Sequence, residues 1–350
     1  MRSLKVAALT GAACMVAFAL VGTQAQNAPA PGAPAAAGAP GAAAPGARGG
    51  RGPVQRVVNY AWAPKPIKPA GWTGVNKPIH RVADVLARHK NQARWSEEIV
   101  RDGENYSGKW IQMAPGDKLG PQFFADDRVM MVIYSGQVRL TVGDQEPVVA
   151  GPGFLVNVPY RTTYSLEVVG DQPVVRFEVN GPNRLPFYPT TLAGTDKPAD
   201  PRGYRMTKIS WAGAGGGFNP PNPNSPSNTR AWLDFNKEIV QGGGRGGAFV
   251  SENGNFMNII NQPGAPTPPD TNLGHWHTDY NEFWYIAQGR VDYKMEGMPV
   301  FSAGVGDVVY APIGLYHRAS GGGTGMSTRI AINPRPSGMH NYHEAAQARQ

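Results

Sequence analysis

Cysteine is almost absent from this chain of 350 residues, where it occurs once, as Cys14. Cys14 lies in a segment that we expect to be removed, so the mature chain has no thiol and no disulfide. Such a chain tolerates an oxidising compartment without using it for crosslinks. The 325 residues that remain (350 − 25) are enough to bury a core that needs no crosslink.

The chain also lacks an apolar run as long as the roughly twenty residues of a membrane span. The run from Val6 to Val21 follows Arg2 and Lys5 and leads to small residues around Ala25. This pattern predicts a secretory signal peptide, residues 1–25, with cleavage near Ala25. The mature protein is then periplasmic or extracellular and has no stable membrane span. An uncleaved anchor is the alternative.

A strong charge of either sign is missing as well. The formal charge of +8 falls to +6 once Arg2 and Lys5 leave with the signal peptide (8 − 2 = 6). This excess is spread along the chain without a clustered stripe of basic and aromatic residues. We therefore expect no nucleic-acid partner.

Residues 26–63 consist mostly of alanine, proline and glycine. Such a segment cannot bury enough apolar surface to offset the entropy lost on ordering, so it is predicted to be a disordered linker. Further on, the spacing of apolar residues from Val82 to Lys90 predicts one short helix. We interpret His80 and His89, which lie at its two ends, as surface residues rather than ligands.

Histidine is also scarce, but three of the seven histidines fall in one composite pattern with a glutamate. His275 and His277 are two residues apart, so both side chains leave the same face of a strand. Glu282 follows a short turn at the head of a strand-like run, and His317 follows a turn that contains Pro312. In a closed barrel these four side chains meet at one point. They suit one divalent transition metal (Fe, Mn, Cu, Ni or Zn) with positions left open for water or substrate.

The pattern resembles the two motifs of the cupin superfamily. The first motif, G-x5-H-x-H-x3,4-E-x6-G, is matched by His275, His277, Glu282 and Gly289, although Gly274 stands directly before the first histidine. The second motif, G-x5-P-x-G-x2-H-x3-N, is matched by Gly306, Pro312, Gly314 and His317, with Gly321 in place of the usual asparagine. The resemblance implies a small double-stranded β-barrel that holds a metal inside.

The first half of the chain repeats this organisation without the ligands. Gly136 and Gly153 are seventeen residues apart, as are Gly289 and Gly306, and Glu98-Ile99-Val100 echoes Glu238-Ile239-Val240. At the same spacing, the counterparts of the four ligands are Gln122, Phe124, Val129 and Tyr164. None of these is a good transition-metal ligand, so the first barrel is predicted to bind no metal and to serve a structural role. A metal-free binding pocket there is the alternative.

The predicted fold is all-β, with two double-stranded β-helix (jelly-roll) barrels in tandem and few short helices. The predicted domains are the degenerate N-terminal barrel, residues 64–200, a connector, residues 201–230, and the metal-binding C-terminal barrel, residues 231–350. The connector region is rich in proline, glycine and asparagine, which is typical of an extended surface segment. Whether the chain forms a homo-oligomer stays open.

The resemblance implies a metalloenzyme that acts on a small organic substrate. Our first hypothesis is a dioxygenase-like oxidoreductase, similar to quercetinase-like cupins, with an aromatic or chelating substrate. The second is a decarboxylase, lyase or isomerase with the same metal, although oxalate decarboxylase-like bicupins usually keep ligands in both barrels. The third is a non-catalytic periplasmic protein that binds a small molecule.

Two further interpretations concern single residues. Glu282 is the candidate catalytic residue, either as a permanent metal ligand or as a general base that leaves the metal. His340, His343 and Glu344 form an H-x-x-H-E pattern near the C-terminus, and we interpret them as surface residues.

Overall fold

The structure is a computed structural model that describes residues 60–191 and 196–343. The predicted signal peptide, residues 26–59 of the predicted linker, and Glu344 lie outside the described residues. The chain divides into two units, residues 1–60 and 61–350, and every element below belongs to the second unit. No helix of the described residues is long and apolar enough to cross a membrane.

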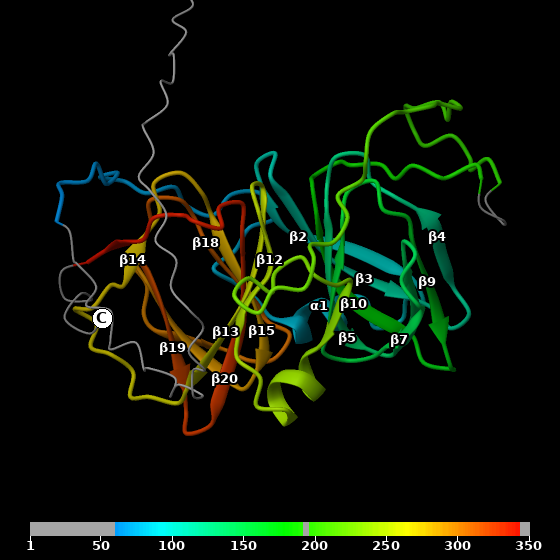
Figure 1. The fold of residues 1–350 in the computed structure, drawn as a ribbon. Coiled ribbons are helices and arrows are strands. Elements are labelled where there is room, and N and C mark those ends of the chain that lie inside the picture. Colours follow the sequence, from blue (N-terminus) through cyan, green and yellow to red (C-terminus); the bar gives the residue numbers. More distant parts are fainter. Residues whose placement is uncertain (1–59, 192–195, 344–350) are drawn as a thin grey trace, which may run out of the picture. The chain divides into compact units, whose positions relative to one another are not determined.

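Two β-barrels, each built from two antiparallel sheets, make up the described residues (Figure 1). The first barrel has the sheet β11 (Trp232–Asp234), β8 (Phe154–Val158), β5 (Val129–Ser135), β10 (Val174–Asn180), β3 (Tyr106–Met113) and β2 (Trp95–Asp102). Its other sheet is β4 (Lys118–Gln122), β9 (Tyr164–Val169), β6 (Gln137–Val142) and β7 (Val148–Ala150).

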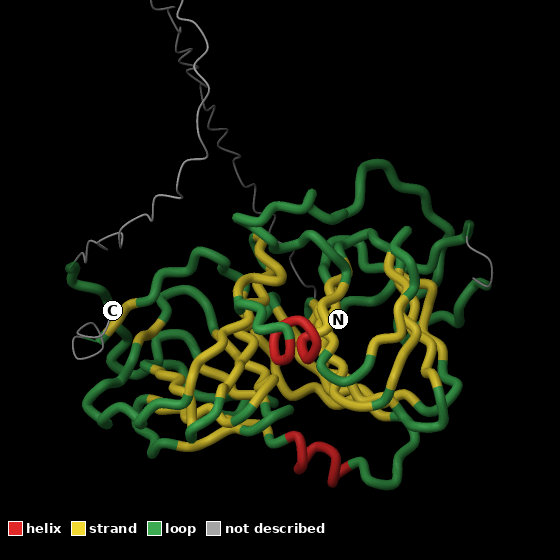
Figure 2. Tube along the Cα trace, turned by 60° about the horizontal axis from the view of Figure 1, so that its bottom comes forward, coloured by secondary structure: helices red, strands yellow, loops and turns green. Residues whose placement is uncertain are grey.

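The second barrel has the sheet β1 (Ile79–His80), β18 (Val308–Ala311), β15 (Glu282–Gln288), β20 (Met326–Asn333), β13 (Asn255–Pro263) and β12 (Gly247–Glu252). Its other sheet is β17 (Phe301–Ala303), β16 (Arg290–Met295), β19 (His317–Gly322), β14 (His275–Trp276) and β21 (Asn341–Tyr342). The two short helices drawn in red in Figure 2 are α1 (Val82–Arg88) and the π-helix η1 (Asn236–Gln241). The predicted all-β double barrel is therefore confirmed.

Some strands bury apolar side chains on one face, and others bury them on both faces. In β6, Val138, Leu140 and Val142 are buried, and they alternate with more exposed residues, as expected of a strand with one face in the core. In β15, by contrast, neighbouring residues are buried on both faces. Phe283 packs in a core shared by the two barrels, whereas Trp284 faces the interior of the second barrel. A strand buried on both faces becomes a continuous apolar run, which is what the sequence shows here.

The barrels exchange strands. β1, from the N-terminal segment, pairs with β18 of the second barrel, where Ile79 lies opposite Val309. β11, which follows the connector, pairs with β8 of the first barrel, where Trp232 lies opposite Val156. The predicted domain boundaries stay a prediction, but each barrel contains one strand from beyond its predicted limits.

The expected equivalence of residues 98–100 and 238–240 is wrong. Residues 98–100 lie in β2, whereas residues 238–240 lie in the π-helix η1. Two carboxylates accept hydrogen bonds from backbone amides at the start of the helix and just before it. Asp234 accepts a hydrogen bond from the backbone N–H of Lys237 (3.0 Å), and Glu238 accepts one from the N–H of Asp234 (3.2 Å). This reciprocal arrangement is typical of a helix start.

His80 is buried, so its interpretation as a surface residue is wrong. Only 7% of His80 is exposed, because β1 joins the sheet of the second barrel. Burial lowers the pKa of His80 from 6.5 to about 4. The predicted helix is confirmed and ends at Arg88, with Val82 and Val85 buried.

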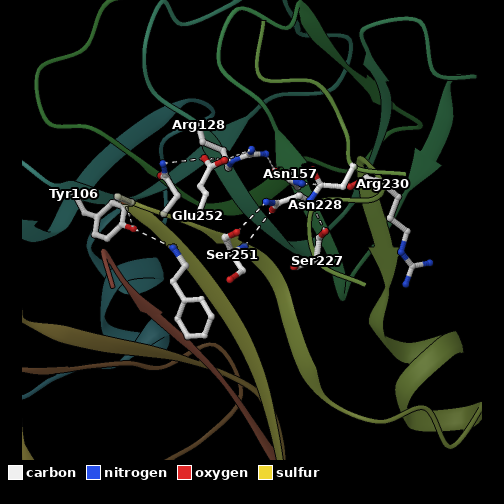
Figure 3. Close-up of polar contacts among 12 residues, drawn as sticks. Tyr106, Arg128, Asn157, Ser227, Asn228, Arg230, Ser251 and Glu252 are labelled. Atoms are coloured by element: carbon white, nitrogen blue, oxygen red, sulfur yellow. Dashed lines mark hydrogen bonds and ion pairs between the residues drawn. The ribbon is translucent and has the colours of Figure 1, made fainter. Parts of the chain in front are cut away.

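A polar cluster joins the first barrel to the hairpin of β12 and β13 (Figure 3). The guanidinium of Arg128, whose side chain is 1% exposed, donates from Nε and Nη2 to the carboxylate of Glu252, each at 2.7 Å. Its Nη1 donates to the side-chain oxygen of Asn157. Nearby, the hydroxyl of Tyr106 lies 2.6 Å from the carbonyl of Gly254. These contacts connect the two barrels by polar groups at the edge of their shared core.

Candidate metal centre

Three strands of the second barrel position the four predicted ligands. His275 lies on β14, directly opposite His317 at the start of β19. His277 follows the end of β14, and Glu282 is the first residue of β15. One ligand atom from each of the four side chains lies within 4.8 Å of the others. The sequence-predicted residues are thus brought together in a cluster that could hold a metal ion.

The geometry of the backbone explains why a glycine, Gly274, stands directly before the first histidine. Its φ of +82° belongs to the left-handed region that favours glycine. A Cβ at this position would lie 2.1 Å from the carbonyl oxygen of His317, which is closer than any real contact. The close approach of β14 to β19 therefore requires glycine at this position, and it brings His275 against His317.

Hydrogen bonds fix the orientation of two imidazole rings. Nδ1 of His277 lies 3.1 Å from the carbonyl oxygen of Met339, and Nδ1 of His317 lies 3.0 Å from that of Leu315. A carbonyl can only accept, so both Nδ1 atoms carry the proton. Each Nε2 then faces the Glu282 carboxylate, at 3.1 Å from His277 and 3.4 Å from His317.

Two imidazole nitrogen atoms in the cluster lack hydrogen-bond partners, and they show whether a metal ion fits there. The Nε2 atoms of His275 and His317 are both buried and have no hydrogen-bond partner. Buried polar atoms without partners are costly, and a metal ion at the centre would satisfy both lone pairs at once. The backbone carbonyls that hold the rings of His277 and His317 are the usual outer partners of metal-bound histidines. The residues therefore fit a divalent ion.

The protonation states also suit metal binding. Burial lowers the pKa of both His275 and His317, so these rings are neutral near pH 7. Burial alone would raise the pKa of Glu282, but the imidazoles of His277 and His317 beside its carboxylate hold it well below its usual value. Neutral imidazoles and an ionised carboxylate are the forms that bind metals.

Aromatic residues surround the cluster. The ring of Trp284 lies 5.2 Å from that of His317, and the ring of Tyr280 stacks on His277 at 4.1 Å. Trp284 and Ile286 face the barrel interior with Glu282, as the alternation in β15 predicts. The ligands themselves are buried except for His275, which is partly exposed. Of the four candidate ligands, His275 is therefore the nearest to solvent.

The C-terminal segment completes the centre, which sequence reasoning missed. β21 pairs with β14, and the ring of His340 lies 4.5 Å from that of His275 and 4.9 Å from that of His277. His340 is exposed, as predicted, but its place beside two candidate ligands corrects its interpretation as an ordinary surface residue. The adjacent residue Met339 supplies the carbonyl that orients His277. The available signal was a further histidine in a chain with only seven.

The first barrel has the same geometry with other side chains. Gln122 lies opposite Tyr164 on β4 and β9, as His275 lies opposite His317. The amide of Gln122 donates to the Tyr164 hydroxyl at 2.8 Å, while Phe124 and Val129 are buried beside them. Within the described residues, metal-type side chains come together in the second barrel alone. An amide–phenol hydrogen bond and hydrocarbon occupy the corresponding space in the first barrel.

Removing residues 339–350 should weaken metal binding by roughly 10–100-fold, because the carbonyl that orients His277 is lost. Calorimetric titration with Ni²⁺ or Mn²⁺ measures the change, and a chain ending at His343 is the control because it keeps Met339 and β21. Equal affinities for the chains ending at Gly338 and His343 would contradict the role of this segment.

Comparison with known proteins agrees with this architecture. No protein-family model matches the chain, and no curated protein matches it by sequence. Salicylate 1,2-dioxygenase from Pseudaminobacter salicylatoxidans has a similar structure, with a TM-score of 0.52 at 10% identity over 77% of this chain and 86% of that one. Oxalate decarboxylase from Lactobacillus farciminis, solved as a formate complex, covers 82% of this chain and 94% of its own at 16% identity and a TM-score of 0.45. In its fold of two β-barrels, the chain is similar to the salicylate dioxygenase.

Proposed function

We propose that the protein is a metal-dependent, dioxygenase-like oxidoreductase that acts on a small aromatic molecule with chelating oxygens. The observation that carries the proposal is the convergence of three imidazoles and one carboxylate, with two buried Nε2 atoms that lack partners. His275, His277, Glu282 and His317 would hold one divalent ion. Bound there, the ion would act as a Lewis acid toward a chelating substrate and leave a position for dioxygen.

The residues around the cluster support an aromatic substrate. The rings of His340 and Tyr342 lie 4.5 and 5.3 Å from that of His275. Flat rings beside the cluster favour a flat substrate, which they would orient by stacking. The fold shared with the salicylate dioxygenase, at a TM-score of 0.52, supports the same class of chemistry.

Of the two roles considered for Glu282, the structure favours that of a ligand. One carboxylate oxygen faces His277 and His317, and the other accepts a hydrogen bond from the amide of Asn333 at 3.4 Å. With both oxygens engaged and its pKa held low, Glu282 is a weak proton acceptor. We propose that it stays with the metal, so substrate protons leave by another route.

Oxygen consumption tests the proposal. The protein, depleted of metal and reloaded with Fe²⁺, is mixed with salicylate, gentisate or catechol in an oxygen-electrode cell, and ring-opened product is followed by mass spectrometry. The proposal expects one dioxygen consumed for each substrate, with no turnover in the His317→Ala variant. Product formation under strict anaerobiosis would instead favour a decarboxylase, lyase or isomerase. Tight binding of substrate without turnover with any of the five candidate metals would favour a binding protein.

We also propose that the protein acts in the periplasm or outside the cell. The basic start, short apolar run and small residues of residues 1–25 support this proposal.

A further inference from the structure

A cavity of about 670 Å³ lies at the first barrel, away from the candidate metal ligands. Its walls come from residues 123–127, between β4 and β5, and from two parts of the extended segment before β11, residues 183–190 and 201–211. Figure 1 shows this segment as green loops beside the first barrel. The volume is within the range of pockets that enclose small organic ligands. Phe124, the counterpart of His277, is among the lining residues.

We propose that this cavity is a second binding site, for a small aromatic molecule that bears an anionic group. Backbone and ring contacts hold its walls together. Phe123 and Phe187 exchange two backbone hydrogen bonds of 2.9 and 2.8 Å, which attach the extended segment to the barrel. The Phe123 ring lies 5.4 Å from that of Phe187 and 5.2 Å from that of Trp211. The cavity therefore has a preformed aromatic wall.

Apolar side chains in the cavity wall are unusually exposed. Four large ones are 39–63% exposed: Leu185, Tyr204, Ile209 and Trp211. Exposed apolar residues that gather around one cavity mark a ligand site, whereas scattered ones need no explanation. An aromatic ligand that fits between Trp211 and Tyr204 would remove much of this surface from water.

The charged side chains of the cavity wall favour a ligand with an anionic group. Both carboxylates of the wall already have arginine partners, Asp126 with Arg161 at 2.6 Å and Asp127 with Arg184 at 2.7 Å. Arg205 and Lys208 also line the cavity, and no ion pair to either side chain occurs within the described part of the chain. Two cations without counterions beside an aromatic wall are complementary to an aromatic anion such as a carboxylate or sulfonate.

Two dyes with the same two aromatic groups, one anionic and one neutral, test the preference for an aromatic ligand and the preference for an anionic one. 8-Anilino-1-naphthalenesulfonate carries a negative charge, and N-phenyl-1-naphthylamine lacks it. Fluorescence titrations use the full chain, with and without metal, because the site should be indifferent to metal loading. The expected result is saturable binding of one sulfonate dye per chain and weaker binding of the neutral dye.

Three variants separate the contributions. The double variant Arg205→Ala/Lys208→Ala should lower the affinity for the sulfonate by about tenfold and leave that for the neutral dye unchanged. Trp211→Ala should weaken binding of both dyes. Lys90→Ala/Lys237→Ala removes the same net charge from exposed positions elsewhere and should change neither affinity.

The proposal is overturned if dye binding does not saturate at one site, or if the two double variants behave alike. It is also overturned if Trp211→Ala has no effect on either dye. The substituted side chains are partly or fully exposed, and thermal melting curves that coincide with those of the unmodified protein verify that each variant is folded.

Discussion

Replacing His317 with alanine should lower the affinity for a divalent transition metal by more than about 100-fold, because one of only four donors is removed. Elemental analysis of the purified protein, together with competition against a chromophoric chelator, measures stoichiometry and affinity.

The control for this substitution comes from the other barrel. Tyr164 occupies the place of His317 on the equivalent strand, so Tyr164→Phe changes the corresponding position of the barrel that lacks metal-type ligands. Metal content should be unchanged in this variant. If His317→Ala retains full metal content, or if Tyr164→Phe loses it, the assignment of the centre to the second barrel is wrong.

Replacing Arg128 with alanine should lower the free energy of unfolding by roughly 3–5 kcal/mol, the usual cost of breaking a buried ion pair from one side. The side chain of Arg128 is 1% exposed, and it holds Glu252 in a bidentate pair while donating to Asn157. The substitution leaves Glu252 without its partner and opens a space between the barrels. Urea unfolding followed by circular dichroism measures the difference.

Two further variants show whether the buried pair causes the effect. Arg94→Ala breaks a pair with Asp117 in which the arginine is 65% exposed, and because solvent screens this pair, the variant should unfold close to the unmodified protein. Arg128→Met/Glu252→Leu removes both charges and should recover most of the lost stability. An Arg128→Ala loss no larger than that of Arg94→Ala would show that the barrels do not depend on this pair.

Much of the candidate centre could be predicted because its signal is local. A spacing of two residues puts His275 and His277 on one side, and the alternation of β15 puts Trp284 with Glu282. The seventeen-residue interval between Gly289 and Gly306 also occurs in the first barrel, between Gly136 and Gly153, whose φ values are +75° and +89°. The predicted counterparts Gln122 and Tyr164 do lie opposite each other.

Short sequence echoes were a weaker guide than glycine spacing. Residues 98–100 and 238–240 share a tripeptide, yet one is in a strand and the other is in a π-helix. At the helix, the carboxylates of Asp234 and Glu238 accept hydrogen bonds from backbone amides. Three residues do not specify a strand when flanking side chains offer the backbone other hydrogen-bond partners.

The amino-acid sequence by itself determined the all-β class, the four candidate ligands and the lack of metal-type ligands at their counterparts, because residue type and strand period are local properties. Tertiary structure alone decided the burial of His80, the exchange of β1 and β11, the place of His340 and the cavity beside Trp211. Each of these depends on which distant segments pair. Many pairings satisfy the same local pattern of apolar residues, and the packing of the whole chain selects among them.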